Sequence, residues 1–276
     1  MRKSRVALLT LLFIAALYLP EVIGKPRLHK ESLNSLVEIL VYYEAETKLS
    51  MAGGTGFVLN NTEEKTMIAT CEHVVDGSPS KIVVFANDEK YPAEIIRTND
   101  KADLAIISID AVLDKQPLTL SEAGLFSTVY AAGYPGSKAY DHSIYFDKST
   151  GMAVTEGRVN FYIGGFHGEP FQVIHSAIED FGSSGGPLLN HKGNVVGVIA
   201  FGDEGYYGAT TTWELKKLCK EAGVEYTYRT NLRLLKDLAA YLLVLILVVY
   251  LMPDEKKKTK AEEKIEKSLL VHRVVG

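Results

Sequence analysis

The chain has 276 residues, a formal net charge of -4 and an isoelectric point near 6.0. It therefore lacks the excess of basic residues that contacts with phosphates need, and nucleic-acid binding is excluded as its main function. The only cysteines are Cys71 and Cys219, so the chain is not a disulfide scaffold. We expect both to be unpaired or buried, and a single bridge between them is the alternative.

Residues 1–24 are predicted to be a signal peptide or a signal anchor. Three basic residues among the first five precede an uncharged run at 6–20. At about 1.5 Å per residue this run spans about 22 Å, which is closer to a signal-peptide core than to the bilayer interior of about 30 Å. Cleavage after Gly24 fits the small residues at that point, and an uncleaved anchor is the alternative.

The region that follows alternates short apolar, β-branched or aromatic segments with turn residues, which is typical of β-strands. A first set of strands is predicted at 35–44, 55–59, 66–70, 81–85, 91–97 and 104–109. Six strands within about 75 residues favour a small barrel or a sandwich.

After a connector at 114–126 the same pattern resumes. The second set of strands is predicted at 128–133, 152–163, 171–177, 195–201 and 206–211. A helix is predicted at 212–222, with Thr212 able to cap its start and Gly223 as its stop. We therefore expect an all-β domain of two halves at 31–227, divided into about 35–113 and about 126–212.

An apolar run at 238–252 contains no charge and predicts a transmembrane helix at 234–252. Four lysines follow within the next eight residues, in a lysine-rich tail at 253–276. Because positive flanks stay in the cytoplasm, we expect a cytoplasmic tail and an extracytoplasmic β domain. A buried core helix is the alternative.

The sequence FGSSGGPLLN contains two adjacent serines beside glycines. A serine that attacks a carbonyl group needs an exposed hydroxyl on a tight turn, with backbone N–H groups facing the oxygen that becomes negative. Gly182 and Gly185 can adopt the dihedrals that such a turn requires. We therefore predict Ser184, rather than Ser183, as the reactive residue. A flexible linker or simple turn is the alternative.

A serine nucleophile needs a base, and histidine is the side chain that exchanges protons near neutral pH. Of the seven histidines, His73 directly follows an apolar strand, while His175 is the rival because its strand leads to the serine loop. Asp103 starts a strongly apolar strand, where a carboxylate is unfavourable unless it is paired. We predict that Asp103 orients His73, with Asp100 as the solvated alternative.

Four segments together resemble the trypsin-like, chymotrypsin-fold serine peptidases, and among them the branch that includes the bacterial HtrA proteases. These segments are ATCEHVV, ADLAII, AAGYPGS, and GSSGGPLLN with GVIAFG. The resemblance covers roughly 36–222 and implies two perpendicular six-stranded β-barrels with the site in the cleft between them. Two departures are a serine at position 183, where zymogen-activated members carry Asp, and the lack of a following PDZ domain.

The resemblance also assigns roles. It implies that His73 is the general base and acid, that Asp103 orients it and that Ser184 is the nucleophile. The backbone N–H groups of Gly182 and Ser184 would form the oxyanion hole. The residues implied to bind substrate are Ile178, Glu179, Ala200, Phe201 and Gly202.

Specificity stays open between two interpretations: Ile178 favours an apolar or small substrate side chain, whereas Glu179 favours a basic one. A substrate strand is expected to pair with 200–202 by β-augmentation. The function that we predict is a membrane-anchored serine endopeptidase acting on polypeptides, with no cofactor and no metal. The alternative is a catalytically inactive protease-like module that binds extended peptides.

Overall fold

The computed structural model describes residues 28–45, 48–77, 81–135, 142–165, 171–203, 206–230 and 232–251, together with Thr10. The chain divides into two compact units, one of residues 26–232 and one of residues 1–25 with 233–276. The predicted signal segment, apart from Thr10, and the predicted tail lie outside the described residues.

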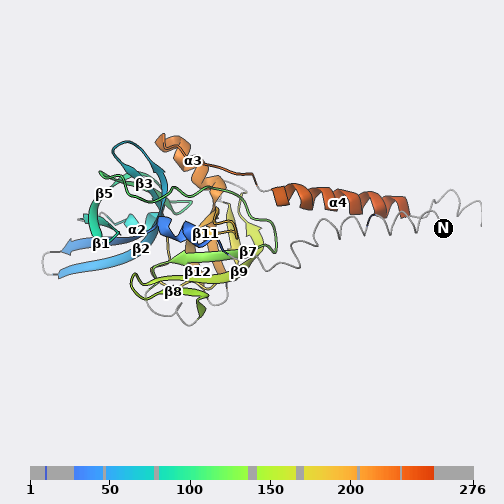
Figure 1. Ribbon diagram of the computed structural model, residues 1–276. Helices are drawn as coiled ribbons and strands as arrows, with labels where there is room; N and C mark the ends of the chain where they lie inside the picture. Colours follow the sequence, from blue (N-terminus) through green and yellow to red (C-terminus); the bar gives the residue numbers. More distant parts are fainter. Residues whose placement is uncertain are drawn as a thin grey trace, which may run out of the picture. The chain divides into compact units, whose positions relative to one another are not determined.

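Six antiparallel strands close into a first barrel in the order β1-β2-β3-β6-β5-β4. Their bounds are β1 (Leu36–Ala45), β2 (Lys48–Asn61), β3 (Thr66–Thr70), β4 (Lys81–Ala86), β5 (Glu89–Asn99) and β6 (Leu104–Ile109). Ile39, Phe57 and Ile106 are fully buried in its core. Strand β2 begins earlier than predicted because every residue of β1 pairs with it. The two strands make a long hairpin (Figure 1).

The second half of the domain forms a seven-stranded sheet in the order β10-β13-β12-β11-β7-β9-β8. Its strands are β7 (Thr128–Gly133), β8 (Tyr145–Asp147), β9 (Met152–Ile163), β10 (Gln172–His175), β11 (Pro187–Leu189), β12 (Val195–Asp203) and β13 (Tyr206–Thr211). Strand β10 pairs with both β13 and β9, which closes six of the strands into a barrel and leaves β8 outside. The predicted pair of six-stranded barrels is confirmed, although the sequence patterns missed β8 and β11.

Short helices accompany the barrels: η1 (Lys30–Ser35) precedes β1, α2 (Glu72–Val75) lies between β3 and β4, and α3 (Thr212–Ala222) follows β13. Helix α3 has the predicted bounds, and Gly223 ends it at a φ of 67°. The predicted cap was wrong by one residue. Thr211 precedes the first helical residue, and the Thr212 hydroxyl instead donates to the carbonyl of Ser121 at 2.7 Å.

The last described helix, α4 (Leu232–Leu251), overlaps the transmembrane helix predicted at 234–252. Among the residues that the structure describes, no helix is both long enough and apolar enough to cross a membrane.

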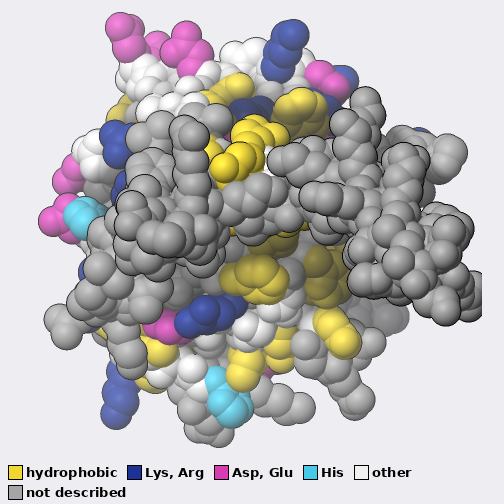
Figure 2. All heavy atoms as spheres, turned by 90° about the vertical axis from the view of Figure 1, so that its right-hand side faces the viewer, with side chains coloured by type: hydrophobic (Ala, Val, Ile, Leu, Met, Phe, Trp, Pro, Cys, Tyr) yellow, Lys and Arg dark blue, Asp and Glu magenta, His cyan; other side chains and the backbone are white. Residues whose placement is uncertain are grey.

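Figure 2 shows one face of the molecule, on which hydrophobic side chains gather near the centre. Acidic and basic side chains are both scattered on this face rather than gathered by sign (Figure 2). No large patch of a single charge is visible there, which agrees with the low net charge of the sequence.

Candidate active site

His73 and Asp103 form a hydrogen-bonded pair at one end of the first barrel. His73 lies in α2, directly after β3, and Asp103 immediately precedes β6, the strand that pairs with β3. His73 Nδ1 lies 2.7 Å from Asp103 Oδ2, and the His73 backbone N–H donates to Oδ1 at 3.0 Å. This arrangement places the ring proton on Nδ1 and leaves Nε2 able to accept a proton.

A strained turn holds Asp103 in place. Its φ of 50° lies in the left-handed region, which is uncommon for a residue with a side chain. The Asp103 N–H donates to the Asp100 carbonyl at 3.2 Å, and the Ala102 N–H donates to Asn99 Oδ1 at 3.1 Å. Asp100 thus contributes its backbone to the turn, and the carboxylate that faces His73 is that of Asp103. Such strain is concentrated at functional sites.

The pair shifts the protonation of both members. The hydrogen bond to Asp103 raises the pKa of His73, although partial burial of the ring opposes this. Burial disfavours the Asp103 carboxylate, but the hydrogen bonds from His73 outweigh this effect and lower the pKa of Asp103. The side chain of His73 is 47% exposed and that of Asp103 is 26% exposed, so a substrate can reach the ring.

Cys71 lies close to Asp103 and was not predicted as part of the site. Its thiol is fully buried and donates to the carbonyl oxygen of Ile199 at 3.0 Å. Burial raises the pKa of Cys71 well above its usual value. Cys71 Sγ, a ring nitrogen of His73 and a carboxylate oxygen of Asp103 all lie within 4.8 Å of one another. The only sequence signal was its position two residues before His73.

The loop of Ser184 is fastened to both barrels by its backbone. Thr55 of β2 donates two hydrogen bonds to this loop. The Thr55 N–H donates to the Ser184 carbonyl at 2.8 Å, and the Thr55 hydroxyl donates to the Gly182 carbonyl at 2.7 Å. In the second barrel, the Gly185 N–H donates to the Ile199 carbonyl at 2.8 Å. Thr55 is a second residue that the sequence did not reveal, since nothing in its pattern marks a contact with residues so distant in the chain.

Gly54 shows how close this loop comes to the segment of His73. A Cβ atom added at Gly54 would lie 2.6 Å from Cγ1 of Val74 and 3.3 Å from the carbonyl oxygen of Ser184. Val74, the residue after His73, and Ser184 therefore both lie next to Gly54, where the two barrels meet. Among the hydrogen bonds of the described residues, none joins the Ser184 hydroxyl to His73. Such contacts commonly tighten only when substrate binds.

The loop geometry distinguishes the two serines. Gly182 and Gly185 have φ values of 94° and 84°, which other residues rarely adopt. Ser183 is buried and its N–H donates to the Asp180 carbonyl at 2.9 Å, whereas Ser184 is half-buried. Within the described part of the chain, the N–H groups of Gly182 and Ser184 donate to no other group. Both amides are therefore available to an incoming oxygen atom.

The predicted strand-pairing edge lies at the end of β12. Ile199 is the last residue of β12 bonded to the serine loop. Beyond it, in the part of the chain that the structure describes, β12 pairs only with β13. Ala200 is buried, Gly202 is exposed, and the Phe201 side chain is 42% exposed. This edge is therefore free to accept an extended peptide.

Glu179 does not have the accessible carboxylate that a basic substrate side chain would need. Its Oε1 lies 3.0 Å from His175 Nε2, and the side chains of both residues are buried. Burial raises the pKa of Glu179, although His175 opposes this. His175 is also unsuited to act as the base, because it is enclosed in the second barrel. The period of two in β10 places it on the same face as Val173, a core residue, so this orientation was readable from the sequence.

Ile178, the other residue predicted to line the pocket for the substrate side chain, is half-buried. Its carbonyl accepts a hydrogen bond of 2.6 Å from the Thr155 hydroxyl. The structure thus keeps Ile178 partly accessible and encloses the neighbouring carboxylate.

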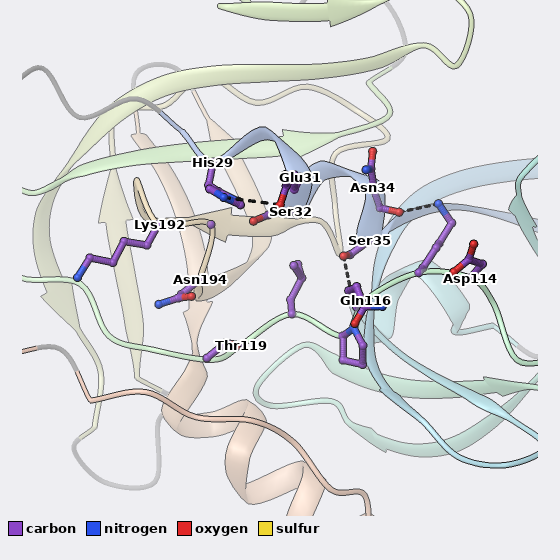
Figure 3. Close-up of a pocket in the computed structure, with 14 residues that line it drawn as sticks. His29, Glu31, Ser32, Asn34, Ser35, Asp114, Gln116, Thr119, Lys192 and Asn194 are labelled. Carbon is purple, nitrogen blue, oxygen red and sulfur yellow. Dashed lines mark hydrogen bonds and ion pairs between the residues drawn. The ribbon is translucent and has the colours of Figure 1, made fainter.

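A separate cavity of about 430 Å³ lies between η1, the connector between the barrels and the turn before β12 (Figure 3). Ser35 Oγ donates to the Gln116 carbonyl at 2.5 Å, and Lys115 Nζ donates to the Asn34 carbonyl at 2.7 Å. None of the three predicted catalytic residues lines this cavity, so it is distinct from the candidate active site.

Comparison with known proteins agrees with this geometry. A family model described as "Trypsin-like peptidase domain" matches residues 54–198, which is more than half of the chain. Serine protease HTRA1 of Xenopus laevis is 32% identical over 167 residues, covering 59% of this chain and 34% of that protein. A probable periplasmic DegP-like serine endoprotease of Chlamydia trachomatis is 33% identical over 162 residues, covering 56% and 30%.

The chain thus spans about a third of the length of these relatives. The fold is also similar to the crystal structure of the active form of the Rv3671c protease from M. tuberculosis. The TM-score is 0.56 at 24% identity, with 71% of this chain and 84% of that chain covered. The matched residues include His73, Asp103 and Ser184. The chain therefore belongs to the family of trypsin-like peptidase domains.

Proposed function

We propose that the chain hydrolyses peptide bonds through His73, Asp103 and Ser184. The observation that carries this proposal is the pair of hydrogen bonds between His73 and the Asp103 carboxylate, beside the loop of Ser184. Asp103 Oδ2 lies 2.7 Å from His73 Nδ1, and Oδ1 accepts from the His73 backbone N–H at 3.0 Å. A half-buried carboxylate that orients an exposed imidazole next to a serine on a tight turn has the arrangement required for nucleophilic catalysis.

In the proposed reaction, His73 Nε2 takes the proton of the Ser184 hydroxyl while the oxygen attacks the peptide carbonyl. The oxygen that becomes negative receives hydrogen bonds from the free N–H groups of Gly182 and Ser184. His73 then gives its proton to the leaving amine, which produces an acyl-enzyme. Water, deprotonated by His73, attacks the ester and releases the acyl group. Asp103 stabilises the imidazolium in both halves of the reaction.

A fluorophosphonate probe tests this function, because it labels only an activated serine. We expect the full chain and Ser183→Ala to be labelled, and Ser184→Ala and His73→Ala to stay unlabelled. Labelling that persists in Ser184→Ala and disappears in Ser183→Ala would show that the other hydroxyl reacts. If the folded wild-type chain is not labelled, the catalytically inactive peptide-binding module becomes the better description.

The proposed substrates are polypeptides bound in extended form along 200–202, where β12 has a free edge. The enclosed carboxylate of Glu179 and the partly accessible Ile178 favour uncharged side chains before the scissile bond. Cleavage of a peptide library checks this. Preferred cleavage after Lys or Arg would contradict the proposed selectivity without contradicting the mechanism.

A membrane anchor at 234–252 and an extracytoplasmic protease domain are also proposed, on the apolar sequence at 238–252 alone. Alkaline carbonate extraction of membranes from cells that produce the full chain tests the anchor. The chain should stay in the pellet, while a variant that ends at residue 230 and lacks residues 1–24 should be released. Release of the full chain would rule out the anchor.

A further inference from the structure

Cys71, His73 and Asp103 bring three different metal-ligating groups together beside the cleft. The relevant atoms lie within 4.8 Å of one another, and no other such group of three occurs within the described residues. We propose that these three side chains bind a thiophilic divalent cation such as Zn²⁺, and that the bound cation switches off the proposed peptidase activity.

The donor atoms, all within 4.8 Å of one another, would have to move by about 1 Å to form a zinc site. Zinc binds sulfur at about 2.3 Å and nitrogen or oxygen at about 2.0–2.2 Å, so tetrahedral donors lie about 3.3–3.7 Å from one another. His73 Nδ1 and Asp103 Oδ2, now 2.7 Å apart, would need to separate by about 0.6–0.9 Å. The half-exposed His73 ring has room to move in this way. The Ile199 carbonyl, 3.0 Å from Cys71 Sγ, or water would provide the fourth ligand.

The charges and protons of this step balance. Binding removes the thiol proton of Cys71 to solvent, so the thiolate and the Asp103 carboxylate neutralise the two charges of the cation. The proton on His73 Nδ1 moves to Nε2, because the cation takes the Nδ1 lone pair. No oxidant or reductant takes part. The pairing of a soft thiolate with an imidazole favours zinc over magnesium or calcium.

The same proton transfer explains the inhibition. Nε2 is the atom that must accept the proton of Ser184, and in the metal-bound form it already carries one. Asp103 would also be occupied as a ligand and would no longer orient the ring. The inhibitory effect rests on the proposed function, whereas the metal site itself does not.

Cobalt spectroscopy tests the site without any need for activity. Co²⁺ bound by a thiolate absorbs strongly in the near ultraviolet through charge transfer from sulfur. We expect this band when Co²⁺ is added to the full chain carrying Ser184→Ala. The band should remain when Cys219→Ala is added, because Cys219 is a buried thiol outside any such cluster. It should disappear with Cys71→Ser and with Cys71→Ala.

Two variants are used because Cys71 is fully buried. Cys71→Ser preserves the size of the side chain and a hydroxyl donor toward Ile199, so its fold is the better protected. Circular dichroism confirms that each variant is folded. A thiolate band that persists in folded Cys71→Ser, or no band in the Ser184→Ala chain, would overturn the proposal.

Activity provides the second arm. Zn²⁺ should inhibit wild type and Cys219→Ala equally, and a chelator should restore both. For Cys71→Ser the concentration that halves its own metal-free activity should rise at least about ten-fold. Equal inhibition of all three would place the inhibitory cation elsewhere. A cobalt band in a chain that no fluorophosphonate labels would contradict the proposed peptidase and leave the metal site intact.

Discussion

The hydroxyl of Thr55, in the first barrel, donates a 2.7 Å hydrogen bond to the carbonyl of Gly182 in the loop that leads to Ser184. The hydroxyl oxygen of Thr55 also accepts a hydrogen bond of 2.9 Å from the N–H of Tyr134, which follows β7. Thr55 is fully buried, so this single hydroxyl joins both barrels to the loop that carries the proposed oxyanion hole.

Thr55→Val should therefore lower kcat/KM about ten-fold, with the loss mainly in kcat, because losing about 1.4 kcal/mol of loop positioning gives that factor. Steady-state kinetics on a cleaved peptide measures it. Thr66→Val is the matched control. Thr66 is also buried and donates to the Ala111 carbonyl at 2.9 Å, but it lies at the opposite end of β3 from His73. It should reduce stability and leave kcat unchanged, and equal kinetic effects of the two changes would refute the positioning role.

Gly185→Ala should destabilise the fold by about 2–5 kcal/mol, from backbone strain together with overpacking. Gly185 has a φ of 84°, and an added Cβ would lie 2.1 Å from Thr70 Oγ1 and 2.2 Å from the Thr55 carbonyl oxygen. Gly151→Ala separates the two effects, since Gly151 has a φ of 76° but no atom within 4 Å of an added Cβ. It should lose only about 1–2 kcal/mol. Urea denaturation measures both, and similar losses would show that close packing at Gly185 contributes little.

The rate should depend on pH through His73, which must be neutral to act as a base. Its hydrogen bond to Asp103 raises its pKa, so the acid limb of kcat/KM should have its midpoint above the usual value of 6.5. Asp103→Asn should lower this midpoint and reduce the rate about 10⁴-fold, the loss known for the equivalent change in this family. Glu72→Gln, which removes a smaller electrostatic contribution, should lower the midpoint slightly and retain most of the rate.

The raised pKa of His73 also determines how folding stability depends on pH. Because the pKa of His73 is higher in the folded chain, its pairing with Asp103 adds stability at pH values below 6.5, and this contribution is lost as the pH rises through the raised pKa. An acid limb centred below pH 6.5, together with an unshifted NMR titration of the ring, would contradict the pairing in solution.

His175→Ala and Glu179→Ala should each destabilise the fold by about 3–5 kcal/mol, because each leaves a buried polar group without its partner. The double variant should lose less than the sum, with a coupling of about 1–3 kcal/mol in a double-mutant cycle. The cycle is measured by denaturation at pH 7. Additive losses would mean that the two side chains, although 3.0 Å apart, do not stabilise each other.

Most strands and the pairing of His73 with Asp103 were predictable because local signals and tertiary structure agree. β3, β6 and β13 have the predicted bounds, since apolar and β-branched residues continue up to turn residues at each end. By contrast, β8 and β11 have only three residues each, and their strand geometry depends on pairing with β9, β7 and β12 rather than on their own composition. A strand of that length has no period that a sequence can reveal.

Contacts across the barrels were the second gap. The roles of Cys71 and Thr55 depend on carbonyl groups about 130 residues away in the chain, at Ile199 and Gly182, and no residue pattern reports them. Glu179 was assigned to substrate because its position in the motif was visible, whereas the partner that neutralises it was not. The sequence thus suggested the proposed catalytic residues one by one, but not the groups that position them.

Both thiols of the chain are free, Cys71 at the end of β3 and Cys219 on α3, and both are buried. No disulfide therefore supports the barrels, and their stability derives from non-covalent contacts. The β domain should accordingly reach the same fold in a reducing bacterial cytosol as in an oxidising secretory compartment, and dithiothreitol should leave its Tm unchanged.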